Sequence, residues 1–194
     1  MNPKLIEKYR DFNVEHVEWW DCTYDVFRED MKTKHIEVKD MNFSGFWSQG
    51  DGASFTGHVV DNKAFLQAHD ISEDDYPAIH RLLAYDGGFS IDINRSMSRY
   101  VHENTVSAEI VAADGFVHIL PSDDFRDHII SQWDEELNRE YDRLQEEVTG
   151  IIRDYCRQLY KSLEDEYDYL TSDEAVWEAI VANELDEEDE EETV

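Results

Sequence analysis

The fold is decided by residues 36–60, which read Ile36-Glu37-Val38-Lys39-Asp40-Met41-Asn42-Phe43-Ser44-Gly45-Phe46-Trp47-Ser48-Gln49-Gly50-Asp51-Gly52-Ala53-Ser54-Phe55-Thr56-Gly57-His58-Val59-Val60. Residues 36–47 and 53–60 are rich in aromatic and β-branched side chains, which favour strands. Residues 48–52 between them are turn formers, and a glycine after Asp51 accepts the positive φ of a tight turn. This pattern predicts an antiparallel hairpin.

A second antiparallel pair is predicted further along the chain. Apolar residues alternate over 88–96, and they alternate again over roughly 100–112. Helical spacing of apolar residues predicts helices on either side of the first hairpin, over 3–15, 18–34, 61–70 and 73–85. The sequence therefore predicts an α+β fold in which helices pack on an antiparallel sheet of about four strands.

The clearest periodicity follows Pro121, where Ser122 is the expected helix N-cap. It predicts a helix of about forty residues, or two helices bent near Gly150. An unbroken helix would be ~60 Å long and would exceed a small sheet, so part of its stripe is expected to fold back or to form a homodimer. The apolar stripe comprises Ile130, Trp133, Leu137, Tyr141, Leu144, Val148, Ile151, Tyr155, Leu159 and Leu163.

Three parts of the chain are expected. Residues 1–121 form the sheet-containing part, and residues 122–184 form a helical part packed on it as one compact unit. The helical part ends with a helix from the cap at 171–174 to about Asn183. Residues 185–194 are expected to be a disordered tail, because Asp186 to Glu192 are seven consecutive acids.

Charge is the most unusual bulk property. The 194 residues include 47 acids and 17 Lys or Arg, a net charge of −30. Residues 122–194 hold −20 of this and residues 1–121 hold −10. Direct binding to nucleic acid or to an anionic membrane is disfavoured, since both require cationic side chains. A basic protein partner is favoured by long-range attraction.

Several kinds of chemistry lack a sequence signal. The eight histidines are scattered without metal-ligand spacing, and no phosphate loop, nucleophile elbow or dinucleotide fingerprint is present. No catalytic residue, metal or cofactor is therefore predicted. Cys22 and Cys156 are expected to be small buried hydrophobes in a reducing cytoplasm, because neither a signal peptide nor a membrane-spanning stretch is evident.

Residues 43–55 form the densest local stretch. Trp47, Gln49 and Asp51 are expected at the hairpin tip, near Tyr100 and His102 of the second pair. These five residues are a candidate recognition site, and with the nearby Arg95 and Arg99 an anionic-ligand pocket is one possibility. The alternative is structural: the aromatic residues pair across strands and the glycines serve the turn.

A second candidate site is the solvent face expected for the long helix. Its carboxylates would stand in for phosphates when a basic nucleic-acid-binding protein is bound. The expected partner-binding residues are Asp134, Glu135, Glu136, Glu140, Asp142, Glu146 and Glu147.

The string Phe43 to Phe55 (FSGFWSQGDGASF), with residues 19–23 upstream and 171–184 downstream, resembles a family of uncharacterised tailed-bacteriophage proteins. The resemblance implies a location in the cytoplasm of an infected bacterium and supplies no catalytic activity. In composition the acidic helical half is similar to phage anti-restriction proteins that mimic DNA, which is an analogy.

Three functions remain open, and binding to another macromolecule is favoured over catalysis. The first is an inhibitor that presents a DNA-like carboxylate surface to a host nucleic-acid-binding enzyme or a defence complex. The second is a small-ligand-binding protein or enzyme that uses a pocket at the 43–55 hairpin. The third is a structural or oligomeric phage accessory protein.

Overall fold

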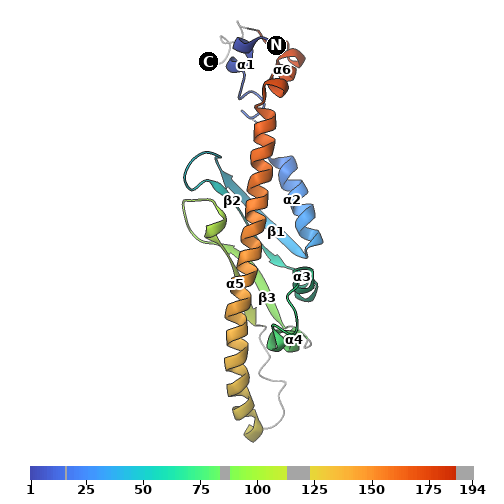
Figure 1. Ribbon diagram of the computed structural model, residues 1–194, viewed down its shortest axis with the longest axis vertical. Coiled ribbons are helices and arrows are strands. Elements are labelled where there is room, and N and C mark those ends of the chain that lie inside the picture. Colours follow the sequence, from blue (N-terminus) through green and yellow to red (C-terminus); the bar gives the residue numbers. More distant parts are fainter. Residues whose placement is uncertain (16, 84–87, 113–122, 187–194) are drawn as a thin grey trace. The chain divides into compact units, whose positions relative to one another are not determined.

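A computed structural model describes residues 1–15, 17–83, 88–112 and 123–186, with the backbone alone at residues 112 and 123–136. It confirms the predicted α+β fold with a four-stranded antiparallel sheet in the order β1-β2-β3-β4 (Figure 1). The elements are α1 (Pro3–Lys8), α2 (Asp21–Thr33), β1 (Ile36–Ser44), β2 (Gly52–Val59), α3 (Asn62–Ala68), α4 (Pro77–Leu83), β3 (Phe89–Arg95), the 3₁₀ helix η1 (Glu103–Thr105), β4 (Val106–Ala112), α5 (Asp123–Leu170) and α6 (Asp173–Ala182).

The chain forms two compact units, residues 27–160 and residues 1–26 with 161–194. The expected boundary near residue 121 does not separate them, because the greater part of α5 belongs with the sheet. The expected disordered tail falls mostly outside the described residues, from residue 187 onward.

The first hairpin forms where the strand pattern placed it. β1 and β2 pair from Ile36↔Val59 to Ser44↔Gly52, with a bulge between Val38 and Asp40. Gly57 lies opposite this irregularity, where an added Cβ would stand 2.1 Å from a β1 carbonyl oxygen. Only glycine fits such a close approach of two backbones.

β2 and β3 share only two residue pairs, Gly57↔Ile93 and His58↔Asp92. β3 and β4, by contrast, pair along their whole length from Phe89 to Arg95. β3 ends at Arg95, so the N-terminal end of β2 extends past it, and there the chain between β3 and β4 approaches β2, with His102 beside Gly52.

One face of the sheet forms the core of the larger unit. Phe55, Ile91 and Ile93 are buried there, and Phe27 of α2 meets Phe55 edge to face at 5.4 Å. α5 covers this core with side chains at three- and four-residue spacing, as the apolar stripe predicted. Its fully buried members up to residue 160 are Leu144, Val148, Ile152, Cys156 and Leu159.

The outer edge of β4 is covered by side chains of α5. Covering an edge in this way prevents it from pairing with a strand of another chain. The bonds run from Ile110 N to Gln145 Oε1 (3.3 Å), from Ala108 N to Thr149 Oγ1 (3.0 Å) and from Arg153 Nε to Val106 O (3.1 Å).

α5 is one helix without a break at Gly150, which settles the alternative of two bent helices. A Cβ at Gly150 would meet no atom within 4 Å, so the glycine is not required by packing. The expected N-cap, Ser122, lies outside the described residues.

The smaller unit has its own apolar cluster, in which Ile6 of α1 packs against Val176 and Ile180 of α6. Ser172 caps α6 as predicted, its side chain accepting from the backbone of Ala175. The helix expected over 3–15 is shorter than predicted, and α1 ends at Lys8. Beyond it, Arg10 and Asn13 donate instead to the carbonyls of Thr171 (3.1 Å) and Leu170 (2.9 Å).

The two cysteines differ from each other. Cys156 is buried as expected, and burial raises the pKa of its thiol to about 12. Cys22 is exposed, so the expectation of a buried residue is wrong for it, and both are free thiols.

Candidate ligand-binding pocket at the first hairpin

The loop that joins β1 to β2 is longer than the predicted tight turn. β1 ends at Ser44, and Gly52 is already paired in β2. The positive φ falls on Gly50, at +95°, rather than on the glycine after Asp51. A turn from Ser48 to Asp51 closes the loop, because Ser48 N donates to Asp51 Oδ2 at 2.6 Å and Asp51 N donates to Ser48 O at 3.1 Å.

Two glycines of this loop bring a distant segment into contact with it. A Cβ at Gly50 would lie 2.8 Å from the Tyr100 ring, and one at Gly52 would lie 2.5 Å from the Cβ of His102. The segment around residues 100–102 therefore rests directly on the hairpin. The glycines serve this close approach as well as the turn.

The segment between β3 and β4 is held in shape by its own hydrogen bonds. Ser96 N donates to Thr105 O at 2.8 Å, which closes the excursion at its base. His102 caps η1, and its Nδ1 accepts from Asn104 N at 3.1 Å. In the neutral imidazole the proton then resides on Nε2, which is left as a donor.

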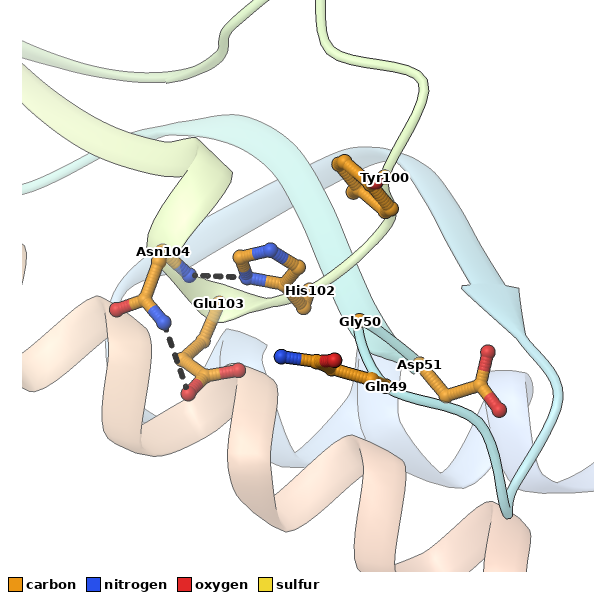
Figure 2. A pocket seen from close by; sticks show the side chains of 7 residues that line it. All are labelled: Gln49, Gly50, Asp51, Tyr100, His102, Glu103 and Asn104. Atoms are coloured by element: carbon orange, nitrogen blue, oxygen red, sulfur yellow. Dashed lines mark hydrogen bonds between the residues drawn. The ribbon is translucent and has the colours of Figure 1, made fainter.

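A cavity of about 570 Å³ lies between the loop and this segment (Figure 2). Figure 2 shows the Tyr100 ring beside Gly50 and the Gln49 amide reaching toward Glu103, while the Asp51 carboxylate points away from this group. The lining residues are Gln49, Gly50, Asp51, Tyr100, His102, Glu103 and Asn104.

The lining offers neutral polar groups and rings. The rings of Tyr100 and His102 lie 6.3 Å apart between centroids with their planes at 41°. Glu103 is the one carboxylate near the two carboxamides, and Arg157 approaches it at 3.8 Å while Asn104 Nδ2 lies 3.5 Å away. None of the seven lining residues is Lys or Arg, so the cavity wall itself provides no cationic anchor for an anion.

A family model described as a domain of unknown function, DUF8835, matches residues 19–173. The chain belongs to this family. The matched region contains both segments of the pocket, whereas the acidic run from Asp186 lies beyond it. None of the curated proteins and none of the solved structures matches this DUF8835 chain.

The structure brings together four of the five residues expected at the recognition hairpin. Gln49, Asp51, Tyr100 and His102 all line the pocket. The carboxylate of Asp51 is engaged inside the loop, so its part in the site is structural. Trp47 is outside the lining; it is 73% exposed and meets Phe46 edge to face at 5.9 Å.

Two pocket residues were missed by the sequence reasoning, Glu103 and Asn104. They lie in η1, a single 3₁₀ turn whose short length gives no periodic pattern. The available signal was local: a histidine two residues before an asparagine can cap a turn with its side chain.

The acidic helix face differs from the expectation at Glu140. This residue was expected on the solvent face but is only 7% exposed. Its Oε2 accepts from Ile79 N at 2.9 Å. Ile79 lies in the first turn of α4, where a backbone N–H has no partner within the helix. The residue before the helix is Tyr76, whose side chain has no short capping oxygen. Glu140 of α5 therefore accepts from the N–H of Ile79 instead.

The other acids of this face have different environments. Glu147 accepts a hydrogen bond from the Tyr76 hydroxyl, and Arg143 stacks over the same ring at 4.3 Å. Burial, followed by this bond, raises the pKa of Tyr76 to about 12. Asp142, Glu146 and Glu147 are all exposed as expected. Asp134, Glu135 and Glu136 lie where the side chains are not described.

The apolar stripe of α5 is largely covered by the chain itself. Leu144 is fully buried, and Ile152 is fully buried in place of the half-buried Ile151. Over residues 144–159 the stripe thus has its partner in the sheet of the same chain, and a homodimer seam would have to use another part of the helix.

Among the described residues, no group of three or more His, Cys, Asp or Glu side chains is arranged to hold a metal ion. The described helices also include none with both the length and the apolar character needed to span a membrane.

Proposed function

We propose that this DUF8835 protein is a ligand-binding protein whose recognition site is the pocket between the hairpin loop and residues 100–104. The observation that carries the proposal is the close seating of these two segments, which are far apart in sequence, around one cavity. Gly50 and Gly52 permit the approach, and His102 is fixed by its bond to Asn104. Convergent polar groups in a preformed concavity are typical of ligand sites.

Binding is favoured over catalysis by the state of the carboxylates. Asp51 is engaged by Ser48 N, and Glu103 is approached by Arg157 and by Asn104. A carboxylate that acts as a general base must lie within hydrogen-bond reach of the substrate proton and be free to accept it. The lining supports recognition through Gln49 and His102 instead.

The test is a binding screen with defined classes of small molecule. Thermal unfolding of the full chain would be followed with nucleosides, monosaccharides, free amino acids and inorganic phosphate. One class is expected to raise the midpoint, because a ligand that binds only the folded state stabilises it. Gln49→Ala and Asn104→Ala should abolish that increase.

The matched control is Glu146→Ala, which changes an exposed side chain remote from the lining residues in sequence and should leave the ligand effect unchanged. A midpoint increase that survives both pocket substitutions would place the ligand elsewhere and overturn the proposal.

A second candidate function rests on charge. The net charge of −30, with −20 in residues 122–194, favours a basic partner. In the bacteriophage setting, that partner would be a host nucleic-acid-binding enzyme or defence complex, bound through exposed acids such as Asp142 and Glu146. The expected result is capture of such a protein from bacterial lysate at low salt and its release at high salt. Retention at high salt, or unchanged capture by Asp142→Asn with Glu146→Gln, would refute the charge-based function.

A further inference from the structure

We infer that the ligand of the hairpin pocket is a nucleobase, presented by a free nucleoside or mononucleotide. This inference rests on the proposed function, since it names the class of ligand for the same site. It is drawn from the two rings, the two carboxamides and the charge of the molecule.

The rings of Tyr100 and His102 provide the stacking surface. The two residues are two positions apart, and their centroids lie 6.3 Å apart with planes at 41°. A base stacked between Tyr100 and His102 needs the two rings to be roughly 7 Å apart, because carbon contacts are optimal near 3.5 Å on each side of the base. A small outward tilt of Tyr100, which is 45% exposed, would admit it. His102 is held by its Nδ1 bond and would act as the fixed wall.

The edge of a stacked base would meet the carboxamides. Gln49 and Asn104 each present an acceptor oxygen and an NH₂ donor, the pairing that reads base edges elsewhere in proteins. Figure 2 shows the Gln49 amide reaching from the loop toward Glu103, beside which Asn104 lies on the opposite segment. Glu103 can accept a hydrogen bond from the exocyclic amino group of such a base.

Charge restricts how the base is presented. A polynucleotide would bring a row of phosphates to a molecule with a net charge of −30, and each contact would need a cation. Two guanidinium groups do lie beside lining residues: Arg99 over the Tyr100 ring at 5.0 Å and Arg157 near Glu103. Either one provides a cation near the pocket for a single phosphate, so a nucleoside and its 5′-monophosphate are the two sources to compare.

The experiment is a titration of ¹⁵N-labelled full-length protein with the common nucleosides, their 5′-monophosphates, glucose and a short single-stranded oligonucleotide. At least one nucleoside or monophosphate is expected to bind and to shift the side-chain NH₂ signals of Gln49 and Asn104. Tyr100→Ala should weaken its affinity by about tenfold, the usual loss when a stacking ring is removed. Tyr100→Phe should retain binding, and Trp47→Ala should not change it.

The alternative outcomes separate the two proposals. If glucose binds and the bases do not, with the same two amide signals shifted, the pocket remains the recognition site and the nucleobase inference fails. Stronger binding of the oligonucleotide than of its nucleosides would overturn the restriction to free nucleotides. If no probe shifts these signals, or if Tyr100→Ala binds normally while circular dichroism shows an intact fold, the nucleobase inference is overturned. Absence of any response in the wider screen as well would refute the proposed function.

Discussion

Replacing Glu140 with alanine tests whether this acid supports the fold or faces a partner. The substitution removes the oxygen that accepts from Ile79 N at 2.9 Å in a buried site. A buried donor left without a partner costs about 1–3 kcal/mol, so we expect a loss of about 2 kcal/mol in the free energy of unfolding. In a chain of this size that lowers the thermal midpoint by about 4–8 °C. Glu140→Gln keeps an acceptor and should lose less than half as much.

Urea unfolding followed by circular dichroism measures the effect, with a lower midpoint at an unchanged slope as the expected result. Glu146→Ala is the matched control, because it removes an exposed carboxylate from the same helix and should change stability by less than about 0.5 kcal/mol. Equal midpoints for Glu140→Ala and Glu146→Ala would refute the capping argument and return Glu140 to the partner-facing surface.

Three further results are expected. Gly52→Ala should destabilise the protein by about 1–3 kcal/mol, because its Cβ would clash with the backbone of the opposite segment, whereas Gly150→Ala should stabilise it by about 0.5–1 kcal/mol; urea midpoints compare the two. Tyr141→Phe should be neutral or stabilising in the same assay, since the buried Tyr141 hydroxyl has no hydrogen-bond partner among the described residues. The pKa of Tyr76 and that of Tyr155 are raised from 10.0 to about 12, mainly by burial. Their contribution to stability should therefore be complete below pH 10 and be lost as the pH rises through about 12, which tyrosinate absorbance and urea midpoints at matched pH values would show.

The hairpins and the long helix were accessible from the sequence because their signals are local. Alternating apolar residues over 88–96 and the stripe on α5 each repeat with one period, and burial follows that period. The one-residue difference arises because Ile152 lies four residues from both Val148 and Cys156, in the middle of the buried row, whereas Ile151 lies at the margin of the stripe.

The pocket was partly predictable. Gln49, Tyr100 and His102 were identified because glycines and aromatic residues are unusually dense near them. That the two segments meet depends on the absence of side chains at Gly50 and Gly52, and a sequence shows the glycine but not what approaches it.

Glu140 could not be placed correctly from the sequence. A carboxylate among many acids on a helix is expected to face solvent, and its acceptor role depends on a backbone N–H 61 residues away. Such a bond has no periodic or compositional signature. The bond from the Tyr76 hydroxyl to Glu147 likewise joins two distant elements and has no such signature, although Glu147 itself is exposed as expected.

The hydrogen bonds between α5 and the edge of β4 join two elements that advance by different distances per residue. Four residues of helix advance about 6 Å and two residues of strand about 6.8 Å, so Gln145, Thr149 and Arg153 match alternate positions of the strand for a few steps only. One residue inserted or deleted between Gln145 and Arg153 would turn the rest of the helix by about 100° and remove its bonds to the strand. The number of residues in this stretch is therefore fixed by the match, and changes in chain length among family members should occur outside it.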